Sequence, residues 1–263
     1  MIKKRKHYFL IVALLFLFVI IAKGAYDNRP FTIIKNNRLT DRKIGIADTI
    51  SLRVNYLWVI PVGVARLENK GEEQYGNKRV YHLCANARLL GFYSRFFDLL
   101  AQADSYVDKA RLHTLRFTQT LIRPNKPKEE KEILYDQEKN FMELEGAKRV
   151  ILPDTHDPLS AIFSIRNQEL NVGKVIDINI NTNQKNYRLY ATVTGREEYL
   201  LKSEKAGVWV IEGTVKRREK NPYHRTTLKL WLMDDAAKTP VLIKAMTNAG
   251  PITARLSMPV QGE

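Results

Sequence analysis

Cysteine is almost absent from this sequence, whose 263 residues include only Cys84. A single cysteine permits no intramolecular disulfide, so the folded part must be held together by its apolar core. A chain of this length is long enough to bury such a core. Cys84 lies in a run that alternates like a β-strand. This position favours a small buried apolar side chain, with a reactive thiol as the alternative.

Recognisable catalytic motifs are also lacking. The five histidines show neither the HExxH nor the HxH spacing of a metal site, nor a familiar Cys/His spacing. The sequence contains no G-x-S-x-G elbow, P-loop or dinucleotide-binding glycine pattern. We therefore predict a protein that is not an enzyme and that has no cofactor and no metal site. A hydrolase built around Asp154, His156 and Asp157 is the weaker alternative.

Long hydrophobic runs are absent except for one, at residues 8–22, which follows four cations in residues 1–7. As a helix this run would span roughly 22 Å, against about 30 Å for the hydrocarbon core of a bilayer. That length is typical of a signal peptide. Small residues at Ala22 and Gly24 predict cleavage before Ala25. An uncleaved membrane anchor over residues 8–22 is the alternative.

The net charge is strongly positive, at +15 for the whole chain. Five of the 43 basic residues precede the predicted cleavage site, which leaves 38 basic against 28 acidic residues and a charge of +10. Such a charge favours anionic surfaces such as phospholipid headgroups. The export signal argues against nucleic acid as the partner.

The remainder of the chain divides into a polar segment and one domain. Residues 25–48 are polar and broken, and they predict a tether or edge segment; we expect residues 49–263 to form a single β-rich domain. Period-two alternation over this domain predicts ten to twelve antiparallel strands in one large, strongly curved sheet, an open or half barrel. One short helix is expected near residues 158–168, where Asp157 can act as the N-cap and Pro158 as the first helical residue.

Aromatic residues supply the candidate ligand-binding side chains. Tryptophans fall on three different predicted strands, and phenylalanines crowd around Gly91. In a strongly bent sheet these residues could line an apolar pocket, although ordinary core packing is the alternative. The candidate pocket residues are Trp58, Phe92, Phe96, Phe97, Trp209 and Trp231.

Several blocks of the sequence, in this order, resemble a family of bacterial exported proteins, the domain of unknown function 3108. They are residues 88–97, residues 104–108, the run Asp-Pro-Leu-Ser-Ala at residues 157–161, residues 230–235, residues 239–241 and residues 250–254. The resemblance implies a β-rich fold similar to the open half-barrel of the lipoprotein carriers LolA and LolB. It implies no catalytic residues.

These observations lead to one principal functional hypothesis. We expect a non-enzymatic protein of the periplasm or cell envelope that binds a lipid, acyl chain or other amphiphile in a concave β-sheet. It would be soluble after cleavage near Gly24, or anchored in the inner membrane by residues 8–22. The alternative is an envelope scaffold or assembly protein that works through contacts with another envelope protein.

Overall fold

The computed structural model describes residues 49–91, 100–123, 126–182, 184–201, 203–218, 225–247 and 250–257. The predicted signal peptide at residues 1–24 and the predicted tether at residues 25–48 lie outside the described residues. Among the described residues, no helix is long and apolar enough to cross a membrane.

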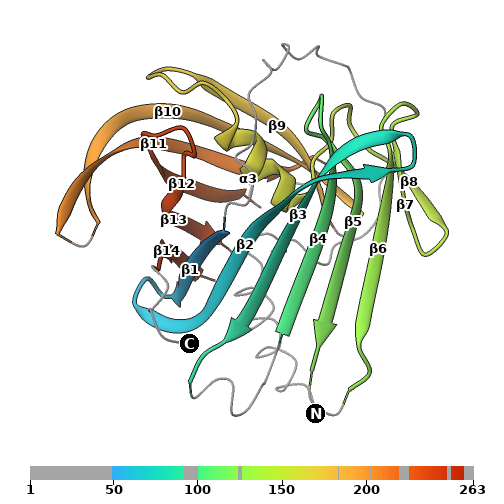
Figure 1. The fold of residues 1–263 in the computed structure, drawn as a ribbon, viewed down its shortest axis with the longest axis horizontal. Helices are drawn as coiled ribbons and strands as arrows, with labels where there is room; N and C mark the ends of the chain where they lie inside the picture. The colour runs from blue at the N-terminus through green and yellow to red at the C-terminus, as the bar shows by residue number, and fades with distance from the viewer. Residues whose placement is uncertain are drawn as a thin grey trace.

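The domain is one curved antiparallel sheet of fourteen strands with a short helix against its concave face (Figure 1). The strands of the first half are β1 (Thr49–Tyr56), β2 (Ile60–Tyr75), β3 (Lys78–Leu89), β4 (Leu100–Asp108), β5 (Thr114–Ile122), β6 (Glu129–Asp136), β7 (Phe141–Leu144) and β8 (Ala147–Val150). After the helix α3 (Pro158–Arg166) come β9 (Val175–Thr182), β10 (Lys185–Leu201), β11 (Glu204–Arg217), β12 (Arg225–Met233), β13 (Pro240–Thr247) and β14 (Gly250–Leu256).

The strand order explains how one short helix can pack against both halves of the sheet. The order is β8-β7-β6-β5-β4-β3-β2-β1-β14-β13-β12-β11-β10-β9, so two meanders meet where β1 pairs with β14. The two edge strands, β8 and β9, are therefore consecutive in the sequence, and the segment that joins them carries α3. This segment crosses the concavity from one edge of the sheet to the other (Figure 1).

The connecting segment also links the two halves of the sheet by backbone hydrogen bonds. The His156 N–H donates to the Asn179 carbonyl at 2.8 Å, and the Asn181 N–H donates to the His156 carbonyl at 2.8 Å. On its other side, the Thr114 N–H of β5 donates to the Thr155 carbonyl at 3.2 Å. Residues 155 and 156 of the connecting segment thus bridge β5 and β9.

Alternation of apolar and polar side chains produces the main core. In β9, for example, Ile176 and Ile178 are buried on the concave side, whereas Asp177 between them is partly exposed. Concave-side residues from the strands and the apolar residues of α3 form one continuous cluster. All nine residues of α3 are buried, because the sheet curves around the helix.

A second, smaller apolar cluster lies on the outer face of the C-terminal half. It consists of Val208, Val210, Trp231, Val241 and Leu242. Tyr199 of the long β10 strand and Met233 pack against it.

The sheet has fourteen strands, somewhat more than the ten to twelve that alternation predicts, and β4 shows why alternation undercounts them. Its concave-side residues are Ala101, Ala103, Ser105 and Val107. Three of these four side chains are small, so the contrast between its two faces is too weak to reveal a strand by hydrophobic alternation. β8 has only four residues, too few for alternation to reveal. The curved antiparallel sheet and the short helix are confirmed.

Candidate functional site

The helix α3 begins where the sequence predicts. Asp157 has an extended backbone conformation, and its Oδ1 accepts hydrogen bonds from the N–H groups of Leu159 at 2.7 Å and Ser160 at 3.1 Å. Pro158 occupies the first turn, where a missing N–H costs nothing. The N-cap interpretation of Asp157 is confirmed.

The second carboxylate oxygen of Asp157 fastens the helix to the sheet. Oδ2 accepts hydrogen bonds from the hydroxyl of Ser105 on β4 and from Thr114 Oγ1 on β5, the latter at 2.6 Å. Thr114 Oγ1 in turn accepts the Asp157 N–H at 2.7 Å. Asp157 is fully buried, so this one side chain both caps α3 and sets its position over β4 and β5.

The C-terminal end of α3 is fixed to the other half of the sheet. Arg166 Nη2 donates to the Ala237 carbonyl at 2.8 Å, and Nε donates to the same oxygen at 3.1 Å. The guanidinium also lies over the Phe163 ring, 5.0 Å from its centroid. The helix is therefore anchored at both ends.

Two cavities lie against α3, one on each flank. The first, about 70 Å³, lies between α3 and β1–β5, and the second, about 90 Å³, lies between α3 and β9–β13. Both are lined mainly by apolar side chains and both are partly open. They share Pro158, Ile162 and Ile243, so these three residues form the partition between them. Together the two cavities are called the trough below.

The first cavity exists because alanines face the helix where larger residues would fill the space. They come from three adjacent strands and pair across them: Ala65 with Ala87, Ala85 with Ala103, and Ala87 with Ala101. The small alanine side chains leave the space beside α3 unfilled.

The second cavity has a different lining. Apolar side chains such as Leu189 and Leu228 form its walls, and three threonines also contribute: Thr182, Thr226 and Thr247. Hydroxyl groups therefore occur beside an apolar space, which suits a ligand with one polar and one apolar end.

Two of the predicted pocket residues, Trp58 and Trp231, are associated with the outer face. Trp58 lies in the turn between β1 and β2, 38% exposed, with a left-handed φ of 69°. Trp231 belongs to the outer cluster, and its Nε1–H donates to Glu197 Oε2 at 2.9 Å. The Lys244 ammonium lies 5.9 Å from the Trp58 ring centroid and 5.4 Å from that of Trp231.

Trp209 points to the opposite side of the sheet from Trp231. It pairs with Leu232, one residue beyond Trp231, and packs against the main core. Its Nε1–H donates to Asp234 Oδ1 at 2.7 Å, and it lines neither cavity. The three tryptophans thus do not converge on one pocket. Phe92, Phe96 and Phe97 lie outside the described residues.

The titratable residues before α3 have partners within this part of the fold, among them Ser160 Oγ, which lies 3.4 Å from His156 Nδ1. Asp157 is committed to the helix cap, and Asp154 Oδ1 pairs with His113 Nδ1 at 3.2 Å, a hydrogen bond that holds the Asp154 pKa below its usual value. Burial lowers the pKa of His156 to about 3. The imidazole therefore stays neutral in its buried position at neutral pH.

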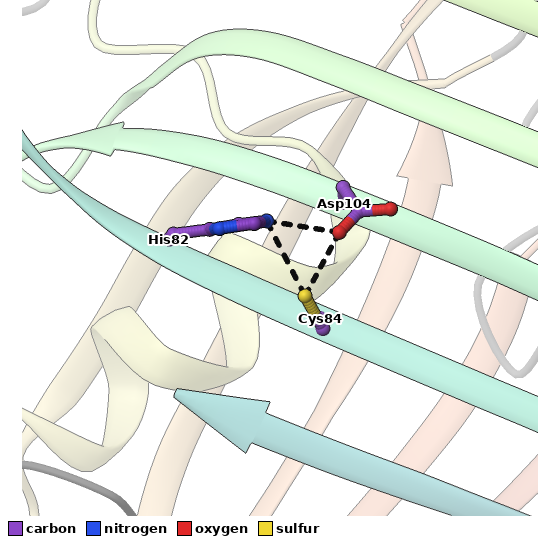
Figure 2. Close-up of side chains that lie close together, drawn as sticks. All are labelled: His82, Cys84 and Asp104. Atoms are coloured by element: carbon purple, nitrogen blue, oxygen red, sulfur yellow. Dashed lines mark hydrogen bonds and ion pairs between the residues drawn. The ribbon is translucent and has the colours of Figure 1, made fainter. Parts of the chain in front are cut away.

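A separate polar cluster lies on the outer face of β3 and β4 and consists of His82, Cys84 and Asp104 (Figure 2). His82 Nε2 is 2.9 Å from Asp104 Oδ1 and 3.3 Å from Cys84 Sγ, and Sγ is 2.8 Å from Oδ1. On the other side of the ring, His82 Nδ1 is 2.8 Å from Glu73 Oε1. Hydrogen bonds to Asp104 and Cys84 raise the pKa of His82 to about 10.

The comparisons with known proteins concern family and fold. The sequence matches the family described as protein of unknown function DUF3108 over residues 50–257. No curated protein matches it. A β-barrel-like protein of the domain of unknown function DUF1849 from Brucella abortus has a similar fold, with a TM-score of 0.56, 9% identity, and coverage of 81% of this chain and 96% of that one.

A second solved structure, a DUF1089 family protein from Pseudomonas aeruginosa, aligns with a TM-score of 0.35 and 10% identity. The alignment covers 81% of this chain and 95% of that one.

Proposed function

The chain belongs to the DUF3108 family, and from the geometry of its concave face we propose that it binds the apolar end of an amphiphilic molecule in the trough beside α3. The observation that carries the proposal is the pair of apolar cavities on the two flanks of one buried helix. Apolar concave sites with a few hydroxyl groups are the usual form of small-molecule sites.

Cavity volume sets the size of the ligand. The two cavities measure about 70 and 90 Å³ and are partitioned by α3 and Ile243, so each is smaller than the 150 Å³ engineered cavity that accommodates benzene. Each cavity therefore takes a slender chain end, not a ring or a whole long-chain lipid. Because both cavities are partly open, the rest of the ligand and its polar group extend into solvent.

We place this activity in the periplasm or cell envelope, as a non-enzymatic binding function. The proposal is supported by the charged and apolar segment at residues 1–22 and by the +10 charge of residues 25–263, which suits anionic amphiphiles. The segment either is cleaved near Gly24 or anchors the chain in the inner membrane.

Calorimetric titration of the full chain with hexanoate, octanoate and palmitate tests the proposal. Each methylene that enters the trough contributes about 0.8 kcal/mol, so affinity should rise from hexanoate to octanoate and then level off at palmitate. An affinity that does not depend on chain length would contradict binding in an apolar trough.

Filling the first cavity should weaken binding. Ala85→Leu and Ala103→Leu each add a branched side chain to the alanine patch, and the double variant should lose at least tenfold in affinity for octanoate. The matched control is Ala206→Leu on β11, which makes the same change at a position that lines neither cavity. Equal octanoate affinity in the double variant and the control would refute the proposed location.

A second candidate function, an envelope scaffold, is favoured by a different observation. The β1–β2 turn exposes consecutive apolar side chains, with Leu57 45%, Trp58 38% and Val59 75% exposed. An apolar patch of this kind suits contact with another protein. Crosslinking in intact cells, compared between the native chain and Val59→Lys, tests it: a crosslinked envelope protein that is lost in Val59→Lys would favour the scaffold.

A further inference from the structure

We propose that His82, Cys84 and Asp104 bind a divalent metal ion of the kind that accepts thiolate and imidazole ligands, with Zn²⁺ as the best match. The sequence predicted no metal site, because its histidines lack the familiar spacings. The three side chains nevertheless present one nitrogen, one sulfur and one oxygen to a common point (Figure 2).

The distances suit a tetrahedral ion. Zinc bonds of about 2.0 Å to nitrogen or oxygen and 2.3 Å to sulfur place neighbouring ligand atoms about 3.3–3.6 Å apart. The observed separations among Nε2, Sγ and Oδ1 are 2.9, 3.3 and 2.8 Å. Each pair therefore has to open by only about 0.3–0.7 Å, which side-chain rotation can supply without moving the strands.

Strand geometry holds the three ligands in place. His82 and Cys84 are two residues apart on β3, so their side chains point to the same face, and Asp104 pairs directly with Cys84 on β4. The His82 ring also stacks on Tyr106, with centroids 4.5 Å apart, which fixes its plane. Ligands on rigid strands are better preorganised than ligands on loops.

Glu73 supplies the support that metal-binding histidines usually have. Its Oε1 is 2.8 Å from His82 Nδ1, on the side of the ring away from Cys84 and Asp104. A metal ion at this point would displace the proton between Nε2 and Asp104 Oδ1, while Glu73 keeps the proton on Nδ1. Glu73 thus holds the ring in the tautomer that a metal ligand needs once the ion is bound.

Charge and ligand type favour zinc over hard cations. A thiolate and a carboxylate together balance the two positive charges of the ion, and sulfur and nitrogen donors select against Mg²⁺ and Ca²⁺. Lys70 is hydrogen-bonded to Cys84 and its exposed side chain is free to turn outward when the ion enters. Three protein ligands leave a fourth position on the side of Asp104, whose side chain is 38% exposed, for water or an external ligand.

Cobalt spectroscopy of the full chain tests this site, since Co²⁺ takes the same ligands and is coloured. We expect one equivalent of Co²⁺ to produce thiolate-to-cobalt charge-transfer absorption and the intense d–d bands of tetrahedral coordination, and Zn²⁺ to displace it. Cys84→Ser should abolish the charge-transfer band and Asp104→Asn should weaken binding. Glu73→Gln should keep the band but lower the affinity about 10- to 100-fold.

The matched control is Glu212→Gln, which removes an outer-face carboxylate that pairs with Lys229 at 2.6 Å, away from the cluster. It should bind Co²⁺ as the native chain does. Absence of the charge-transfer band in the native chain, or its persistence in Cys84→Ser, would overturn the proposal. If Cys84→Ser does not fold, protection of Cys84 from alkylation by Zn²⁺ in the native chain decides the question: no protection would also overturn it. The cluster lies on the opposite face from the trough, so fatty-acid binding and metal binding can fail independently.

Discussion

Removing the carboxylate of Asp157 should separate α3 from the sheet and cost much of the stability of the domain. The side chain accepts four hydrogen bonds, two from the first turn of the helix and two from the hydroxyls of Ser105 and Thr114. Loss of an N-cap costs about 1 kcal/mol, and the buried Ser105 hydroxyl left without an acceptor costs about 1–3 kcal/mol, whereas Thr114 Oγ1 keeps Ser160 Oγ as a partner at 2.9 Å. We therefore expect Asp157→Ala to lower the free energy of unfolding by about 2–4 kcal/mol, of a typical total of about 5–15 kcal/mol.

Urea denaturation followed by circular dichroism measures this change, through the midpoint at constant m-value. Asp108→Ala is the matched control, because Asp108 Oδ1 also accepts two nearby N–H groups, from Ala110 and Arg111 at 2.9 Å each, but at an exposed position. The control should cost no more than about 1 kcal/mol. Comparable losses in Asp157→Ala and Asp108→Ala would refute the argument from burial.

A double-mutant cycle separates the cap from the tertiary anchor. Ser105→Ala should be costly in the native chain but nearly neutral in Asp157→Ala, since the hydroxyl then has no partner to lose. The coupling energy should be at least about 1 kcal/mol. Strict additivity would show that Ser105 and Asp157 act independently, contrary to the hydrogen bond between them.

Three further predictions concern other parts of the chain. Burial lowers the pKa of His156 to about 3, so below its unfolded pKa of about 6.5 the unfolded chain binds the proton that the folded chain refuses. The free energy of unfolding should therefore decrease as the pH falls from about 6.5 towards 3, by up to about 1.4 kcal/mol per pH unit. His156→Gln should remove this part of the pH dependence, which urea denaturation at several pH values measures. The same pH dependence in His156→Gln and the native chain would contradict the prediction. Gly213→Ala should destabilise the domain by about 1–3 kcal/mol in urea denaturation, because the added Cβ would lie 2.4 Å from the Ala191 Cβ. Gly195→Ala is the control and should change stability little, because the space around Gly195 is open. Similar costs for the two variants would contradict the packing argument. Sequencing the mature N-terminus should find Ala25 if the signal is cleaved; an intact Met1 would instead support the anchor.

Local structure was predictable where the physical cause is local. The helix start at Asp157 and Pro158 depends on a cap within three residues, and the isoleucines of β9 alternate clearly. The turn between β6 and β7 follows from its polar composition, and the chain does turn between Asp136 and Phe141.

Features that depend on strand pairing could not be read from the sequence. The side to which a tryptophan points is set by register, which is why Trp209 and Trp231 face opposite ways. The trough depends on alanines from three strands meeting under α3. The spacing of His82 and Cys84 is visible in the sequence, but Asp104 reaches them only through the β3–β4 register.

The pairing of β1 with β14 also determines how the domain can fold. Leu52 pairs with Leu256, roughly 200 residues later, whereas every other neighbouring pair of strands is consecutive in the chain. Closing so long a loop costs conformational entropy before its contacts form, which slows folding. Each meander can assemble locally, so we expect the β1–β14 seam to form last. During synthesis, a chain that has left the ribosome only as far as β13 would hold two half-sheets that are not yet joined. Their unpaired edge strands, β1 and β13, could then pair with strands of other chains.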